Sequence, residues 1–139
     1  MAKKIIKGKN YYKQLKQLLN NCVTNLTGIG VAAILVTDKG PFPGVNFEHS
    51  ICSISMCAER VALYGALPYG INKIYEVHIL SRLNGMSMCG ACRQAVSAYA
   101  DKDCRVYSYI YATGGRTECT LGKLLPEAPL TVKNKVHIK

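Results

Sequence analysis

MCAERVALYGA, residues 56–66, is the stretch on which the rest of the chain depends. Its apolar residues recur at helical spacing, which predicts a helix over residues 57–67 that ends at a proline and a glycine. Cys57 and Glu59 both fall in the first turn of this helix. The sequence therefore predicts a thiol and a carboxylate side by side at a helix N-terminus.

A second stretch, MCGACRQAV at residues 88–96, places Cys89 and Cys92 in a C-x-x-C pair at the start of another predicted helix, residues 91–100. Three thiols and one carboxylate at these spacings suit a zinc ion with three protein ligands, an open fourth position and a proton carrier beside it. A helix N-terminus also favours the thiolate form that binds metal.

The neighbouring side chains favour a catalytic site over a structural one. Arg60 and Arg93 are placed to donate to the ligand sulfurs and offset their negative charge. Glu59 can carry protons between water and a substrate. The alternative is a structural four-cysteine zinc site that recruits Cys52 or Cys104, but such sites are typical of small modules with little core of their own.

Outward from the two cysteine stretches, strands and helices alternate. This order predicts an α/β fold, a three-layer α/β/α sandwich around a mixed five-stranded sheet, in a single domain spanning residues 1–139. Two further helices are expected: one capped by Asn10 that ends at 20–24, and a short one over 121–125 capped by Thr120. The expected strands are a central strand 29–37, an antiparallel strand that two prolines restrict to starting near Gly44, and strands 73–81, 104–112 and 116–120.

Composition narrows the function further. The chain has 139 residues, 49% of them hydrophobic, with seven cysteines and a net charge of +10. Its longest apolar run, residues 31–36, is too short for a membrane helix, and no signal peptide is evident, so we expect a cytoplasmic protein without disulfides. Most lysines gather near the two ends without aromatic and arginine interleaving, which favours solvated termini over a nucleic-acid surface.

Asn46 and Glu48 are expected to project on the same side of the second strand, because side chains alternate between faces. An amide and a carboxylate presented together can bind a sugar hydroxyl. A polar strand edge that faces solvent is the alternative.

The cysteine motifs resemble those of the zinc-dependent cytidine deaminases, specifically the small homotetrameric three-cysteine type. The resemblance runs from about Gly30 to Pro126. It implies a zinc cofactor, a small nucleoside substrate and a homotetramer. It further implies zinc ligation by Cys57, Cys89 and Cys92, proton transfer by Glu59, binding of the ribose 3′-hydroxyl by Asn46 and Glu48, contact of the pyrimidine edge with the backbone around Ala58, and hydrogen bonding of ligand sulfurs by Arg60.

Three positions depart from the family pattern. Gly28 stands where an aromatic residue is usual, Pro129 where a phenylalanine is usual, and Met88 where a proline precedes the C-x-x-C pair. Two missing aromatics remove stacking surface, so the departures concern substrate preference more than chemistry.

The sequence thus leads to one main functional hypothesis and two alternatives. The first is hydrolytic deamination of cytidine and deoxycytidine in pyrimidine salvage. The second is a deaminase of a modified or antibiotic aminopyrimidine nucleoside, because blasticidin-S deaminase also has a histidine three residues after the asparagine, as in Asn46 and His49; it lacks the acid found at Glu48. The third is a basic zinc-bearing nucleic-acid-binding module.

Overall fold

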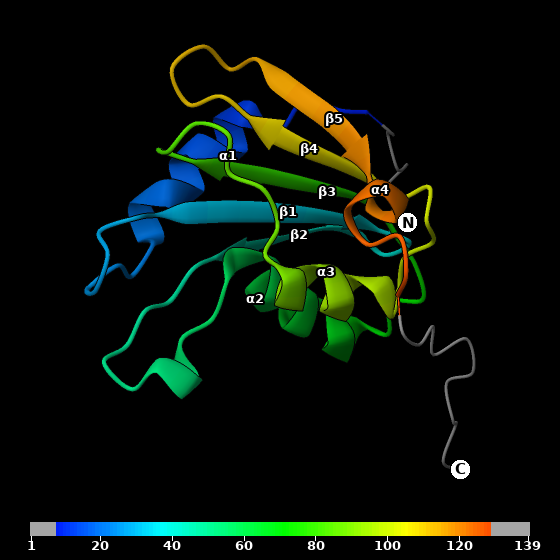
Figure 1. Ribbon diagram of the computed structural model, residues 1–139, viewed down its shortest axis with the longest axis horizontal. Coiled ribbons are helices and arrows are strands. Elements are labelled where there is room, and N and C mark those ends of the chain that lie inside the picture. Colours follow the sequence, from blue (N-terminus) through cyan, green and yellow to red (C-terminus); the bar gives the residue numbers. More distant parts are fainter. Residues whose placement is uncertain (1–7, 129–139) are drawn as a thin grey trace.

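The computed structural model describes residues 8–128, which fold around one five-stranded sheet in the order β2-β1-β3-β4-β5 (Figure 1). Strands β3 and β4 are parallel and the other neighbours are antiparallel, so the sheet is mixed, as predicted. The strands are β1 (Val31–Thr37), β2 (Gly40–Val45), β3 (Ile74–Ser81), β4 (Arg105–Tyr109) and β5 (Arg116–Thr120).

Helices cover both faces of this sheet (Figure 1). Leu35 packs with the helices at residues 58–66 and 90–97 in one apolar cluster, whereas Ala32 and Ile34 pack with the helix at residues 12–18 in another. Both faces of β1 are therefore buried, and this explains why its residues are apolar on both faces. The helices are α1 (Tyr12–Leu18), α2 (Ala58–Ala66), α3 (Gly90–Ser97) and α4 (Leu121–Leu124), with 3-10 turns η1 (Leu19–Asn21), η2 (Cys52–Ile54) and η3 (Leu67–Tyr69). Within residues 8–128, no helix is both long and apolar enough to cross a bilayer.

The predicted start of the second strand near Gly44 is wrong. Strand β2 begins at Gly40 and includes Pro41 and Pro43. It forms an edge of the sheet, and the two prolines pair with alternate residues of β1. Their missing N–H groups fall on the open side of the strand, where no ladder hydrogen bond is lost.

Smaller differences concern the first helix and the first strand. Tyr11 is the N-cap of α1, while Asn10 accepts a hydrogen bond from the Tyr12 N–H one residue outside it. Strand β1 is a buried interior strand between β2 and β3, as predicted, but it begins at Val31, two residues later than expected. Lys16 lies over the ring of Tyr12 in a cation–π contact on α1. The terminal lysines outside residues 8–128 lie beyond the described part of the chain, as does Pro129.

Close contact between β2 and α2 depends on Gly44. A Cβ atom at this position would lie 2.2 Å from the carbonyl oxygen of Ala58 and 2.5 Å from the amide nitrogen of Ala62. Both are backbone atoms of α2, so they cannot turn aside as a flexible side chain would. The missing side chain therefore lets the first turn of α2 rest directly on the sheet.

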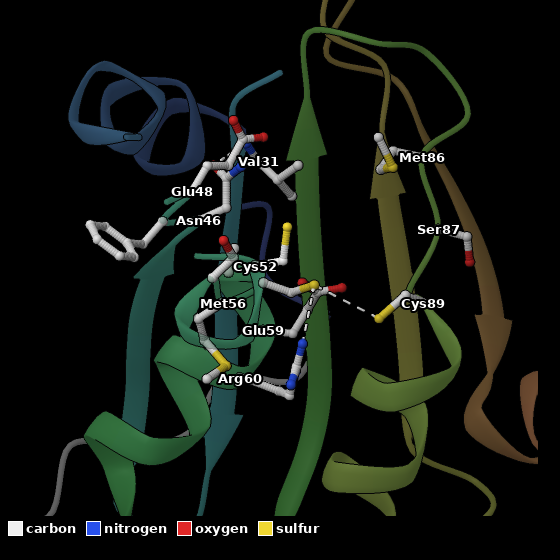
Figure 2. A pocket seen from close by; sticks show the side chains of 14 residues that line it. Val31, Asn46, Glu48, Cys52, Met56, Glu59, Arg60, Met86, Ser87 and Cys89 are labelled. Atoms are coloured by element: carbon white, nitrogen blue, oxygen red, sulfur yellow. Dashed lines mark hydrogen bonds between the residues drawn. The ribbon is translucent and has the colours of Figure 1, made fainter. Parts of the chain in front are cut away.

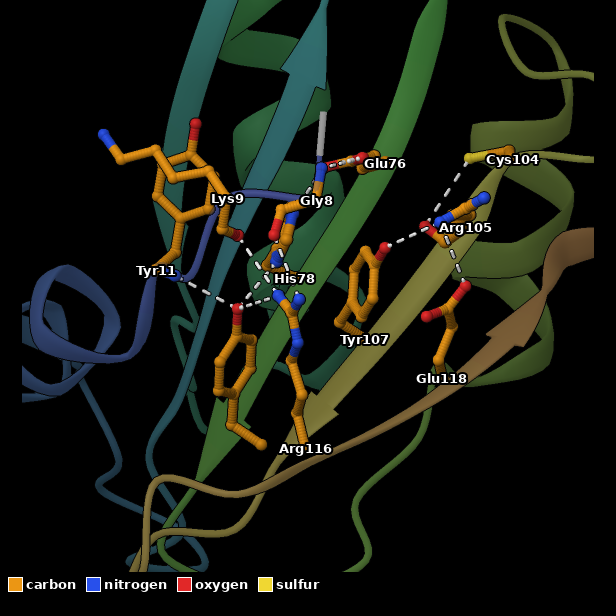
Figure 3. Close-up of polar contacts among 11 residues, drawn as sticks. Gly8, Lys9, Tyr11, Glu76, His78, Cys104, Arg105, Tyr107, Arg116 and Glu118 are labelled. Carbon is orange, nitrogen blue, oxygen red and sulfur yellow. Dashed lines mark hydrogen bonds and ion pairs between the residues drawn. The ribbon is translucent and has the colours of Figure 1, made fainter. Parts of the chain in front are cut away.

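On the opposite face, a buried polar network ties the chain before α1 to the sheet (Figure 3). His78 bonds Glu76 through Nε2 and the hydroxyl of Tyr109 through Nδ1, both at 3.0 Å. The same hydroxyl accepts from the N–H of Tyr11 at 3.1 Å and from Arg116 at 3.2 Å. Burial lowers the pKa of His78, which keeps the imidazole neutral at pH 7.

Replacing Tyr109 with phenylalanine should lower the free energy of unfolding by about 1–3 kcal/mol, because it leaves the buried groups of Tyr11 and His78 without their partner. Urea denaturation measures this change. Tyr64→Phe is the control, since Tyr64 is 47% exposed and a surface change there should stay within about 0.5 kcal/mol. Equal stability of the two variants would show that the Tyr109 hydroxyl does not hold the network together.

Candidate active site

Three thiols converge where the N-termini of α2 and α3 meet. The Sγ atoms of Cys57, Cys89 and Cys92 all lie within 4.8 Å of one another. Cys57 and Cys89 are the N-cap residues of α2 and α3, and Cys92 follows in the first turn of α3. The two N-cap sulfurs are 3.8 Å apart. This arrangement can hold one metal ion with three thiolate ligands.

Among the described residues, this group contains three cysteines and no fourth. Cys104 is buried in the core between the sheet and its helices, and Cys52 lines the pocket without joining the group. The structural four-cysteine alternative is therefore not favoured within residues 8–128.

Hydrogen bonding stabilises a thiolate in the cluster. Hydrogen bonds lower the pKa of Cys57 to about 5. The largest contribution comes from the side chain of Cys92, and the next comes from Arg60, whose Nη2 lies 3.6 Å from Sγ of Cys57. Arg60 thus lies where it can offset negative charge on sulfur. The expectation for Arg93 is wrong, because its guanidinium donates to the carbonyl oxygens of Met88 at 2.8 Å and Leu124 at 3.0 Å.

Glu59 projects from the first turn of α2 toward the cysteine cluster. Its side chain is 4% exposed, and burial raises the pKa of its carboxyl group. Figure 2 shows Glu59 and Cys89 directed into the same space from α2 and from the start of α3. A buried carboxylate beside a metal-binding group is suited to carrying protons.

A pocket of about 360 Å³ brings most of the predicted residues together. Its lining includes Cys57, Cys89, Glu59 and Arg60, together with Asn46, Glu48 and Ala58. The remaining predicted residue, Cys92, is fully buried behind this wall and does not line the pocket. Sequence reasoning missed the rest of the wall, including Val31, Ser55, Met56, Met86 and Ser87. No motif marked these residues. Phe47 is the one aromatic residue that the described chain contributes to the lining.

Asn46 and Glu48 lie just beyond the end of β2 and hold the segment 26–31 at the pocket. Asn46 accepts from the N–H of Val31 and donates to the carbonyl oxygen of Ile29, both at 2.9 Å. Glu48 accepts from the N–H groups of Leu26 and Thr27, both at 2.9 Å. The alternative of a strand edge that simply faces solvent does not describe these contacts.

The position that lacks the family's aromatic residue lies in this segment. Gly28 has a φ of +72°, in the left-handed region, and its N–H donates to the carbonyl oxygen of Thr24 at 3.0 Å. A tight turn of this kind favours glycine over any residue with a side chain. Backbone atoms therefore replace an aromatic ring here.

Comparison with known proteins finds cytidine deaminases as relatives both in sequence and in structure. No family model matches the sequence. The cytidine deaminase of Sporosarcina psychrophila is 35% identical over 98 residues, which cover 70% of this chain and 71% of that protein. The cytidine deaminase of Halalkalibacterium halodurans is 32% identical over 98 residues, covering 70% and 74%. The crystal structure of cytidine deaminase from Burkholderia pseudomallei has a TM-score of 0.72 at 25% identity and covers 88% of this chain and 99% of that one.

Proposed function

The chain belongs to the cytidine deaminase family, and from this membership we propose that it converts cytidine and deoxycytidine to uridine and deoxyuridine. We assign it to pyrimidine salvage in the cytoplasm, with zinc as its cofactor. The observation that carries this proposal is the buried carboxylate of Glu59, which shares a pocket with Cys57 and Cys89, two of the three clustered thiols.

The donor set fits zinc. Cys57, Cys89 and Cys92 would hold the ion, because thiolates bind zinc well and three protein ligands, which leave a fourth tetrahedral position open, are typical of catalytic zinc sites. When bound, zinc supplies the Lewis acidity that makes a water molecule nucleophilic near neutral pH. Arg60, which donates to Cys57, would limit the charge on the sulfurs so that this acidity is kept.

Glu59 would move the protons of the reaction. It takes one proton from the attacking water and delivers it to ring nitrogen N3 as the new C–O bond forms at C4. It then passes the second proton of that water to the amino group, so that the C4–N bond breaks and ammonia leaves. The buried position of Glu59 keeps bulk water from competing for these protons.

The other predicted residues would position the nucleoside. Asn46 and Glu48 lie at the pocket wall where they would bind the 3′-hydroxyl of the sugar, and the backbone around Ala58 would meet the edge of the pyrimidine. Glu48 argues for a plain nucleoside over an antibiotic substrate, because a carboxylate is a strong acceptor for a sugar hydroxyl.

A substrate panel tests this proposal. The zinc-loaded chain should release ammonia from cytidine and deoxycytidine, with uridine or deoxyuridine formed in equal amount. Blasticidin S should be a poor substrate. Blasticidin S as the best substrate would favour the antibiotic alternative, whereas no deamination together with oligonucleotide binding that weakens steeply with salt would favour the nucleic-acid module.

We also propose a homotetramer. Exposed apolar side chains gather beside the pocket on the segments around Val23 and Phe47. An exposed apolar patch of this kind is typical of a protein–protein interface, so we expect neighbouring subunits to bury it. The exposed side chains are Val23, Leu26, Phe47, Ile51 and Ile54. Light scattering should give four times the chain mass of 15.2 kDa, and a monomeric mass at micromolar concentration would reject this assembly.

A further inference from the structure

The hydroxyl of Thr27 links the carboxylate of Glu48, the proposed sugar-binding group, to the turn that contains Thr27. It donates to Oε1 of Glu48 at 2.5 Å and accepts from the N–H of Ile29 at 3.0 Å. The two N–H groups of Leu26 and Thr27 donate to the other oxygen, Oε2. Glu48 therefore meets three donors from one short turn.

These three donors use most of what the carboxylate can accept. A carboxylate has about four acceptor positions, two on each oxygen. Both positions of Oε2 are taken by backbone N–H groups, and one position of Oε1 is taken by Thr27. One acceptor position on Oε1 of Glu48 remains free. The hydrogen bond from the Thr27 hydroxyl to Oε1 fixes the direction in which this position points.

Asn46, in the same pocket wall, is more deeply buried than Glu48. It is 8% exposed and is held by backbone groups on both sides of its amide. Glu48 is less buried, so its longer side chain would sample several rotamers if only the backbone held it. The hydrogen bond from Thr27 also lowers the pKa of Glu48, which keeps this group an ionised acceptor at and well below neutral pH.

We infer that Thr27 is a positioning residue for sugar recognition: its hydroxyl fixes Glu48 so that one free acceptor position of Oε1 is presented to a hydroxyl group of the substrate's sugar. The substrates that benefit are nucleosides with a free 3′-hydroxyl. Thr27 is not part of the pocket lining, and its hydroxyl bonds Glu48 and the turn, so it acts through Glu48. This inference rests on the proposed nucleoside deaminase function.

The test compares Thr27→Val, which keeps the shape and removes the hydroxyl, with Thr27→Ser, which keeps the hydroxyl. KM and kcat of the zinc-loaded full chain are measured for cytidine and for 3′-deoxycytidine. Thr27→Val should raise KM for cytidine about tenfold, the size expected from weakening a hydrogen bond to a charged group. KM for 3′-deoxycytidine and kcat for both substrates should stay within about twofold. Thr27→Ser should behave like the wild type.

Three results would overturn the inference. An unchanged KM for cytidine in Thr27→Val would show that Glu48 needs no help from Thr27. An equal rise in KM for cytidine and 3′-deoxycytidine would show that Thr27 shapes the pocket in general. A wild-type chain that binds zinc but does not deaminate cytidine would refute the proposed function itself, and the inference with it. Activity of the wild type therefore separates the two failures.

Discussion

Replacing Glu59 with glutamine is expected to lower kcat for cytidine by about 10²- to 10⁴-fold, the usual contribution of a positioned proton carrier. Glutamine has nearly the same shape and cannot take a proton. Because Glu59 is not one of the three thiols, the variant should keep its bound metal and its fold. The measurement is the rate of uridine formation, together with the zinc content of the same preparation.

Glu118→Gln is the matched control. Glu118 lies on β5, exposed, 3.4 Å from Arg105, and it is not part of the pocket lining. Its loss of charge should change kcat by less than about twofold, because exposed ion pairs contribute little. Wild-type turnover by the Glu59→Gln variant would contradict the assigned mechanism.

Replacing Gly44 with alanine should destabilise the protein by about 3 kcal/mol or more, at the upper end of the cost of overpacking. The added Cβ would lie 2.2 Å from the carbonyl oxygen of Ala58, so either α2 or β2 has to move. Because Cys57 and Glu59 belong to the first turn of α2, activity should fall together with stability. Urea denaturation and cytidine turnover measure the two effects.

Gly65→Ala is the control for this variant. Gly65 lies inside α2, and no heavy atom of the described residues beyond its immediate surroundings comes within 4 Å of a Cβ built there. Alanine is a better helix former than glycine, so this variant should be more stable by up to about 1 kcal/mol. If Gly44→Ala is as stable as the wild type, close contact at Gly44 does not position α2.

Much of this architecture follows from local sequence patterns. Strand β5 has the predicted bounds, and Thr120 caps α4 by accepting from the N–H of Lys123. The placement of Cys57 and Cys89 at the starts of two helices was also predicted. These features depend on periodicity and on capping, which act over a few residues.

Features that depend on tertiary context were predicted less well. Pro41 and Pro43 indicate a later start for β2, and only the position of β2 at the edge of the sheet explains why they are tolerated. Arg93 is next to a thiol in sequence, yet α4 offers its guanidinium a carbonyl oxygen. The bonds between Glu48 and Thr27 join residues that are 21 positions apart, and no motif announces them.

The central claim is that one metal ion is held by three sulfur atoms with one position left for water. X-ray absorption at the zinc edge of the zinc-loaded chain tests it most directly. We predict three sulfur neighbours, from Cys57, Cys89 and Cys92, and one oxygen or nitrogen neighbour. Four sulfur neighbours would contradict the claim, because a closed site leaves no place for the reacting water.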